Sequence, residues 1–309
     1  MITRLLAIGE SLIDVVDAPD ADGSPILVEH PGGSPMNIAV GAARLGLPVT
    51  LLTEVGPDAR GQAIVQHVEA SGVTVDPVSF RTEPTSSATA HIQTDGSADY
   101  SFDLRWSLPA GLPAPMAGIA HTGSLGAFVE PGGSAVVELL RAAGQDVLIT
   151  FDPNIRPSLV GEHPDAFARF AEIAALAAVL KLSDEDAAWL YPGLGLDEVI
   201  DRILDLGPAL VAVTRGGEGA LLATRRDRVA VAGVRVDVID TIGAGDSFMS
   251  ALIAQLAGLL EAGASPHEVR DASVIDAAAL ERIGAFAVRC AAITVSRAGA
   301  NPPHLTDLD

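Results

Sequence analysis

The sequence predicts an α/β protein with a mostly parallel central sheet between two layers of helices. Short, continuous apolar runs are typical of strands buried on both faces, and they occur at residues 5–8, 49–55, 147–151 and 210–214. Stretches with apolar residues on one helical face occur at 35–45, 59–71, 134–143, 165–178, 243–260 and 276–292. Buried strands that alternate with helices indicate a parallel sheet covered on both sides.

One part of the chain departs from this alternation. Residues 88–93 and 98–104 predict a hairpin around Asp95-Gly96, and residues 11–29 predict a strand, a turn at Gly23 and a return strand. We expect these pieces to form a small antiparallel sheet that stands off the main one as a lid over a site. The lid would be built from about residues 11–31 and 86–107 of one domain that spans residues 1–309.

The composition excludes several classes of protein. The formal charge of −21 argues against nucleic acid or an anionic membrane as partner, because both require a basic face, but it leaves a phosphate ligand open. Cys290 is the only cysteine, so an intrachain disulfide and a cysteine-based zinc site are excluded. No apolar run has the length of a signal peptide core or a membrane span, so we expect a cytoplasmic protein.

The chain has a single lysine, Lys181, which lies between two leucines. A P-loop requires Gly-Lys followed by Ser or Thr, so a P-loop kinase is excluded. A dinucleotide-binding loop requires Gly-x-Gly-x-x-Gly. The one glycine loop that opens a helix has Phe248 at the third glycine position, which argues against an NAD-dependent oxidoreductase.

That glycine loop is the strongest chemical feature of the sequence. An extended run is followed by Asp240-Thr-Ile-Gly-Ala-Gly-Asp246 and then by a long amphipathic helix. Free N–H groups and the positive end of the helix dipole form an anion hole there, suited to a transferring phosphoryl group. Asp246 in the first turn can accept a proton from a hydroxyl aimed at the same place. An ordinary helix cap by Asp246 or Ser247 is the alternative interpretation.

These residues resemble a known family. The run from Asp240 to Phe248 is similar to the C-terminal signature of the ribokinase-like (PfkB-type) carbohydrate kinases, and Gly32-Gly-Ser-Pro-Met-Asn37 through Gly46 is similar to their N-terminal signature. The resemblance spans essentially the whole chain. It implies a ribokinase-like three-layer α/β/α sandwich and ATP-dependent phosphorylation of a sugar. It also implies that Asp246 is the general base and that the backbone of Gly243, Ala244 and Gly245 forms the anion hole.

The resemblance also assigns the two substrates to opposite halves of the chain. Asp14, Gly32, Gly33 and Asn37 match the residues that hold the sugar. On the nucleotide side, the matching positions are Lys181, Ser183, Thr214, Gly216, Gly217 and Gly219. Ser183 and Asp186 stand where the family has Asn-x-x-Glu. The departure retains the oxygen ligands that Mg²⁺ prefers, so Asp186 is expected to act on magnesium through water.

Some members of the family bind a monovalent cation such as K⁺ behind the anion hole. The matching positions are Asp240, Ile242, Thr294, Arg297 and Gly299, mostly through backbone carbonyls. Pro303 stands where a serine is often used. The resemblance therefore allows this cation as a cofactor beside ATP and Mg²⁺, without requiring it.

The identity of the sugar depends on two arginines. Arg156 ends the run Asp152-Pro-Asn-Ile-Arg156, which is typical of fructokinase-like and 2-keto-3-deoxygluconate-kinase-like members. Arg105 lies close to the sequence position at which fructokinases carry an arginine that faces the substrate. A structural ion pair is the alternative for Arg156, and a position without substrate contact is the alternative for Arg105. Fructose is the first prediction and 2-keto-3-deoxygluconate the second, with ribose or a nucleoside left open. A sugar sensor without catalysis is the alternative from another class. The resemblance also predicts a homodimer through the lid.

Overall fold

The computed structural model describes residues 2–19, 25–92 and 98–309. Within these residues the main sheet has nine strands in the order β13-β12-β11-β10-β9-β8-β1-β4-β5. The strands are β1 (Leu5–Ile8), β4 (Val49–Leu52), β5 (Val73–Val75), β8 (Ile119–Gly123), β9 (Leu148–Asp152), β10 (Val179–Ser183), β11 (Leu210–Thr214), β12 (Gly219–Ala223) and β13 (Arg228–Ala232). Only the β11–β12 and β12–β13 pairs are antiparallel. The mostly parallel sheet is therefore confirmed.

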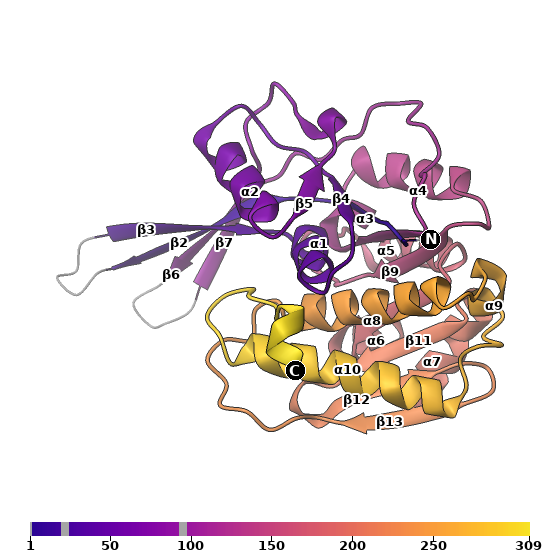
Figure 1. The fold of residues 1–309 in the computed structure, drawn as a ribbon. Helices are drawn as coiled ribbons and strands as arrows, with labels where there is room; N and C mark the ends of the chain where they lie inside the picture. The colour runs from indigo at the N-terminus through magenta and orange to yellow at the C-terminus, as the bar shows by residue number, and fades with distance from the viewer. Residues whose placement is uncertain (1, 20–24, 93–97) are drawn as a thin grey trace.

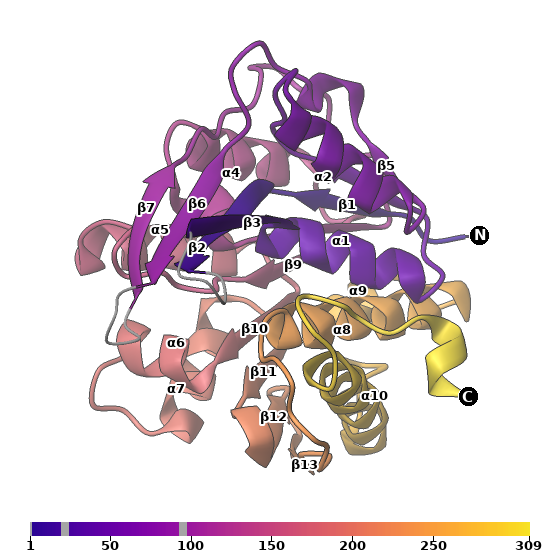
Figure 2. The ribbon, with the colours of Figure 1, turned by 90° about the vertical axis from the view of Figure 1, so that its left-hand side faces the viewer.

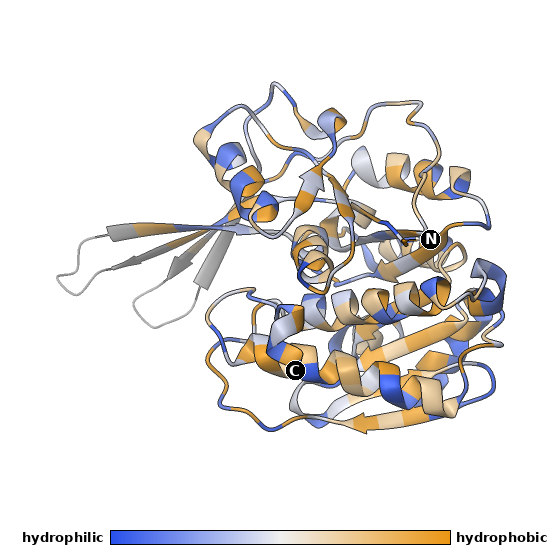
Figure 3. Cartoon of the chain, viewed as in Figure 1, coloured by the Kyte–Doolittle hydropathy of each residue, from blue (hydrophilic) through white to orange (hydrophobic). Residues whose placement is uncertain are grey.

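Two helical layers cover this sheet (Figures 1 and 2). One layer contains α1 (Ser34–Arg44), α2 (Ala59–Glu69), α8 (Ala244–Glu261), α9 (Pro266–Arg270) and α10 (Ala277–Val295). The other contains α3 (Ser124–Phe128), α4 (Gly132–Ala142), α5 (His163–Ala174), α6 (Asp184–Leu190) and α7 (Leu196–Leu206). Successive strand residues enter the two cores in turn, as Leu51 and Leu52 do. Hydrophobic residues therefore run along the central strands (Figure 3).

Most of the predicted elements are present, but the extended run before Asp240 forms no strand, and β5, β8, β10, β12 and β13 were not predicted. Strands β1 and β11 have the predicted bounds, and α8 and α10 start within one residue of the predicted positions. The helix expected over 165–178 instead covers His163–Ala174, and the chain then turns into β10. The sequence hides this turn because no glycine or proline interrupts the apolar stretch between α5 and β10.

A second sheet, called the lid sheet below, contains β2 (Leu12–Pro19), β3 (Pro25–Gly32), β6 (Ser87–Ile92) and β7 (Ala98–Asp103), in the order β3-β2-β6-β7. Figure 1 shows it projecting from the side of the main body. Both hairpins are antiparallel as predicted, but β2 and β6 pair in parallel, so the sheet is mixed. The predicted turns at Gly23 and Asp95-Gly96 lie outside the described residues.

The order of the strands fixes where a ligand can bind. From β1 the chain adds β4 and β5 on one side and β8 to β11 on the other. The direction of winding therefore changes between β1 and β8. In open α/β sheets, ligands bind in the crevice at the carboxyl ends of the strands at such a point. Three short 3₁₀ turns complete the described elements: Pro77–Ser79, Gly216–Glu218 and Leu305–Leu308.

Candidate active site

The predicted anion hole lies at the N-terminus of α8. Gly243 caps the helix with φ 76°, a left-handed conformation that only glycine adopts without strain. The loop before it is held by Asp240, whose carboxylate accepts hydrogen bonds from the backbone N–H groups of Ile242 (3.0 Å) and Gly299 (2.9 Å). Ala244 and Gly245 then form the first turn. The N–H of Ala244 donates to the carbonyl of Thr241 at 3.3 Å, whereas the N–H of Gly245 and the helix dipole make this turn attractive to an anion.

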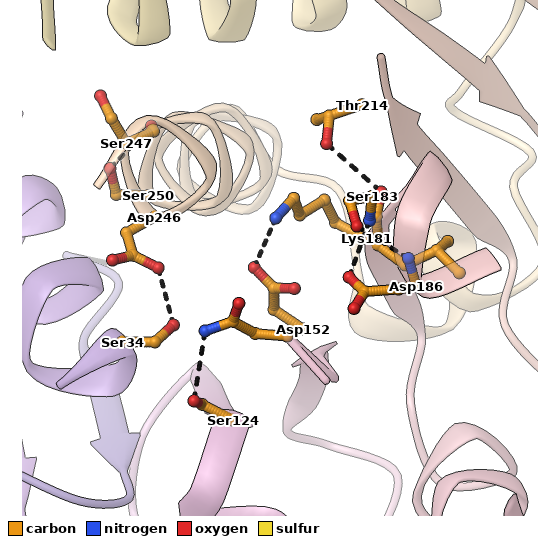
Figure 4. A network of polar contacts seen from close by, with 12 residues as sticks. Ser34, Ser124, Asp152, Lys181, Ser183, Asp186, Thr214, Asp246, Ser247 and Ser250 are labelled. Carbon is orange, nitrogen blue, oxygen red and sulfur yellow. Dashed lines mark hydrogen bonds and ion pairs between the residues drawn. The ribbon is translucent and has the colours of Figure 1, made fainter. Parts of the chain in front are cut away.

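Asp246 completes the first turn and bonds away from its own helix. Its Oδ1 accepts a hydrogen bond from Ser34 Oγ at 2.7 Å, and its Oδ2 accepts one from Asn37 Nδ2 at 2.8 Å. Figure 4 shows the Asp246 carboxylate facing Ser34 across the site. The N-cap Gly243 has no side chain to cap with, and Ser247 Oγ is buried without a partner among the described residues. The Asp246 carboxylate therefore points towards α1 and does not cap its own helix, as the predicted base requires.

Asp14 and Gly32, the two residues of the lid sheet that are predicted to bind the sugar, lie in contact. A Cβ on Gly32 would stand 2.1 Å from Asp14 Oδ2, so the carboxylate occupies the space that the glycine leaves free. The Asp14 side chain is exposed to solvent, but desolvation by neighbouring atoms still raises its pKa. The positive charges of His30 and Arg156 act in the opposite direction and lower that pKa. Arg156 therefore lies within electrostatic range of Asp14.

The two predicted arginines differ in placement. Arg156 is exposed and follows β9, at the carboxyl edge of the main sheet, where its Nη1 donates to the carbonyl of Ile155 at 3.1 Å. Arg105 lies just after β7, and its Nη1 is 3.0 Å from Asp103 Oδ1. Arg105 therefore lies in a local ion pair, and Arg156 lies within electrostatic range of Asp14.

A buried ion pair lies at the centre of the site. Lys181 Nζ is 2.8 Å from Asp152 Oδ2, and the two residues are 4% and 0% exposed. Burial raises the pKa of Asp152 to about 6. Burial by itself would lower the pKa of Lys181, but the nearby carboxylates of Asp152, Asp186 and Asp246 raise it above its usual value. At neutral pH this geometry therefore favours an ammonium paired with a carboxylate.

Ser183 and Asp186 form a capping box at the start of α6. Ser183 Oγ accepts from the backbone N–H of Asp186 at 2.9 Å, and Asp186 Oδ2 accepts from that of Ser183 at 3.0 Å. The other carboxylate oxygen accepts from the N–H of Ile155 at 2.8 Å. Both oxygens keep further lone pairs, so a contact to a metal-bound water fits. In the described part of the chain, no three His, Cys, Asp or Glu side chains cluster so as to hold a metal ion.

The predicted nucleotide loop follows the next strand of the sheet. Ser183 ends β10 and Thr214 ends β11, and the two pair in register. The loop then turns through Gly216–Glu218, and Gly219 opens β12. Gly216 and Gly217 are exposed, so their backbone is open to a ligand. These residues lie at the same carboxyl edge of the sheet as Asp152.

The positions matched to a monovalent cation partly converge. Asp240 and Gly299 are joined by the hydrogen bond described above, and the carbonyl of Thr294 accepts from the N–H of Arg297 at 3.0 Å. The Arg297 guanidinium binds Asp307 at 3.0 Å instead of facing the loop, and Ile242 is exposed. The loops that would hold the cation are therefore neighbours, but several of their polar groups already have protein partners.

Sequence reasoning missed four polar residues of the site. Ser34 and Asp152 were present in the quoted motifs, yet no local pattern shows that their side chains face Asp246 and Lys181. Glu10 follows β1, and its carboxylate accepts a hydrogen bond from the N–H of Gly126 at 2.6 Å. Burial raises the pKa of Glu10 to about 7. Asn154 donates to Ser124 Oγ at 3.2 Å, and both have positive φ, 38° and 49°. Such strained residues cluster at functional sites.

Comparisons with known proteins agree with this geometry. Residues 2–307 match the pfkB family carbohydrate kinases. A fructokinase of Rhizobium leguminosarum bv. trifolii is 31% identical over 259 residues, which is 82% of this chain and 79% of that protein. Probable fructokinase-4 of Arabidopsis thaliana is 31% identical over 323 residues, covering 98% of this chain and 94% of the relative.

Solved structures give the same result. The structure of a fructokinase with bound ATP from Xylella fastidiosa covers 100% of this chain and 98% of its own, with a TM-score of 0.85 and 26% identity. A fructokinase from Vibrio cholerae O395 in its fructose-, ADP- and calcium-bound form covers 97% of this chain and 94% of its own, with a TM-score of 0.78 and 26% identity. No helix in the described part of the chain is long and apolar enough to cross a membrane. With Asp246 of one signature bonded to Ser34 and Asn37 of the other and the match spanning nearly every residue, the chain belongs to the pfkB family of carbohydrate kinases.

Proposed function

We propose that this carbohydrate kinase is an ATP-dependent fructokinase. The observation that carries the proposal is the position of Asp246, which faces the side chains of the sugar signature from the first turn of an anion-binding helix. The relatives reported above are fructokinases by name, and the solved relative from Vibrio cholerae binds fructose and ADP. They support fructose as the acceptor and ATP as the donor.

In this proposal the sugar lies between the lid sheet and α1. Asp14 and Asn37 bind its hydroxyl groups, Gly32 and Gly33 allow close approach, and Arg156 contributes from the edge of the main sheet. Asp246 then takes the proton of the reacting hydroxyl as the oxygen attacks the γ-phosphate. Because phosphoryl transfer depends on positioning and charge stabilisation, this arrangement suffices without a covalent intermediate.

The nucleotide lies along the carboxyl edge of β10 and β11. Lys181 and Ser183 face its phosphates, and the loop from Thr214 through Gly216, Gly217 and Gly219 follows the ribose. Asp186 acts on Mg²⁺ through water, and Mg²⁺ when bound neutralises charge on the phosphates. A monovalent cation is proposed at Asp240 and Gly299. A structure of a double mutant of the Vibrio cholerae fructokinase contains fructose, ADP and a potassium ion, which supports this cation.

We also propose a cytoplasmic homodimer that pairs through the lid sheet. The cytoplasm holds the ATP that the reaction consumes. The lid sheet ends on two edge strands, and unpaired edges favour association with another chain.

A panel of acceptors tests the proposed substrate. ADP release is measured with ATP and Mg²⁺ in the presence of fructose, 2-keto-3-deoxygluconate, ribose, tagatose 6-phosphate or adenosine. We expect the highest kcat/KM with fructose. A higher kcat/KM with 2-keto-3-deoxygluconate would make Arg156 a carboxylate ligand and would overturn the proposal. Binding of fructose by calorimetry with no release of ADP would indicate a sensor instead of a kinase.

A further inference from the structure

The Lys181–Asp152 ion pair has a cost that packing alone does not explain. Each buried ion loses several kcal/mol of hydration, and replacing such a pair with apolar residues is often neutral or stabilising. The pair nevertheless holds the only lysine of the chain, at 4% exposure, inside the parallel sheet. This combination points to a function for the positive charge.

The ammonium lies against the anion-binding turn. A Cβ on Gly245 would stand 2.9 Å from Lys181 Nζ, so the glycine leaves the space that the ammonium needs. Figure 4 shows the Lys181 side chain directed towards Asp152 and the end of the helix that carries Asp246. The cation thus lies beside the backbone N–H groups that would bind the transferring phosphoryl group.

The charges around the turn show why a cation is needed. A helix N-terminus supplies only about half a positive charge. Three carboxylates, those of Asp152, Asp186 and Asp246, lie within electrostatic range of Lys181. A phosphoryl group in transfer spreads negative charge over three equatorial oxygens. Without a full positive charge at this position, the carboxylates would repel the group that the site must stabilise.

We propose that Lys181 is a catalytic residue whose ammonium donates a hydrogen bond to the transferring phosphoryl group, and that Asp152 is the positioning residue that holds it there. Lys181 remains protonated throughout, and the proton of the sugar hydroxyl goes to Asp246. This role rests on the proposed kinase reaction and deepens it, because it assigns Lys181 to the transferring group and not to the ADP that remains.

Two single variants and one double variant separate this role from a structural one. Lys181→Met is expected to lower kcat by roughly 10²-fold or more, the scale of a lost donor to a developing charge. Because this variant leaves Asp152 buried and unpaired, it is expected to unfold at a lower temperature. Asp152→Asn keeps the ammonium and is expected to lower kcat much less.

The double variant Lys181→Met/Asp152→Asn removes both charges and is expected to regain thermal stability while kcat stays low. Recovery of kcat to about the level of Asp152→Asn would show that Lys181 only neutralises Asp152, and would overturn the proposal. Arg169→Met is the matched control. It removes a cation that pairs with Glu130 on the molecular surface, so kcat should remain that of the unaltered protein.

A direct measurement uses the uniqueness of the lysine. Protein labelled with [ζ-¹⁵N]lysine gives one side-chain signal, because Lys181 is the only lysine. We expect that signal to move when ADP with beryllium fluoride, a γ-phosphate mimic, replaces ADP alone. An identical signal in the two states would overturn the contact. No sugar is added, so failure of the fructose assignment and failure of the Lys181 assignment remain distinguishable.

Discussion

Asp246 is oriented by side chains from the opposite end of the chain. Its two hydrogen-bond donors, Ser34 and Asn37, precede it by 212 and 209 residues. Each carboxylate oxygen accepts one of these bonds and retains lone pairs for an incoming hydroxyl. The helix that carries Asn37, a predicted sugar ligand, therefore also positions the predicted base. The geometry of Asp246 depends on how that helix packs.

Asp246→Asn tests the base. The amide cannot accept the hydroxyl proton, so kcat is expected to fall by roughly 10²-fold or more. ATP binding is expected to persist, because the backbone of Gly243 to Gly245 is unchanged. Turnover is measured by ADP release and ATP affinity by titration calorimetry. Near-normal turnover in a variant that still binds ATP would contradict the mechanism.

Glu10 gives a pH-dependent prediction at the same scale. Burial raises its pKa from 4.5 to about 7. The unfolded chain therefore loses this proton at lower pH than the folded protein, so the stability that the group contributes is full below pH 4.5 and is lost as pH rises through about 7. Glu10→Gln carries no charge to bury. Its melting temperature is expected to exceed that of the unaltered protein at pH 8, and the difference is expected to vanish near pH 4.

Asp58 supplies the opposite case as a control. Burial by itself would raise the pKa of this helix N-cap, but hydrogen bonds from Thr85 and Gly61 to its carboxylate lower the pKa below its usual value. A lowered pKa stabilises the fold above pH 3.8, and that contribution disappears as pH falls through the folded value. Asp58→Asn should therefore lose stability at pH 8 and lose less in acid. Two variants with the same pH dependence would contradict the assignment for Glu10.

At the scale of the elements, the crossing of α1 over α8 sets the distance between sugar residues and base. Gly41 of α1 lies at this crossing, where an added Cβ would stand 2.4 Å from Ser250 Oγ. Gly41→Ala should push the helices apart and lower both the melting temperature and kcat. Ser250→Ala in the same chain removes that oxygen and should restore part of each loss. The measurements are thermal unfolding and ADP release.

Gly258→Ala is the matched control for this prediction. Gly258 lies on α8 with no atom within 4 Å of its added Cβ. Alanine is the better helix former by up to about 1 kcal/mol, so this variant should be as stable as the unaltered protein or more so. If Gly41→Ala behaves like Gly258→Ala, the crossing does not limit the site.

The elements themselves were largely predictable, for a physical reason that also explains the exceptions. A strand buried on both faces is apolar throughout, and a helix between layers is apolar on one side, so both leave local patterns such as 210–214 and 243–260. Strands β5, β8, β12 and β13 were not predicted, and β10 was missed because its apolar residues continue those of α5. The parallel pairing of β2 with β6 was also missed, since pairing between hairpins depends on contacts that are distant in sequence.

At the scale of the whole molecule, the lid sheet exposes apolar residues. Leu27 and Val28 are neighbours in β3, so they point to opposite faces, and they are 62% and 42% exposed. A sheet that exposes an apolar side chain on each face and ends on an edge strand is suited to pair with a second copy. This supports the proposed dimer through the lid.

Leu27→Asp/Val28→Glu is expected to convert that dimer to a monomer at micromolar concentration, because two charges would be buried in the interface. The mass is measured by light scattering after size exclusion. Met116→Glu is the control, since Met116 is 99% exposed and lies outside the lid sheet. A monomeric unaltered protein would refute the dimer itself. A mass that the double variant leaves unchanged would place the interface elsewhere.

The sequence by itself determined the fold class and predicted the anion-binding turn and the base, because each depends on residues that are adjacent in the chain. Only the tertiary structure decided that Ser34 and Asn37 hold Asp246 and that Lys181 is buried under Gly245 beside Asp152. These contacts join the ends of strands and helices that are far apart in sequence. Their distances follow from how the layers pack, and a local pattern carries no record of that packing.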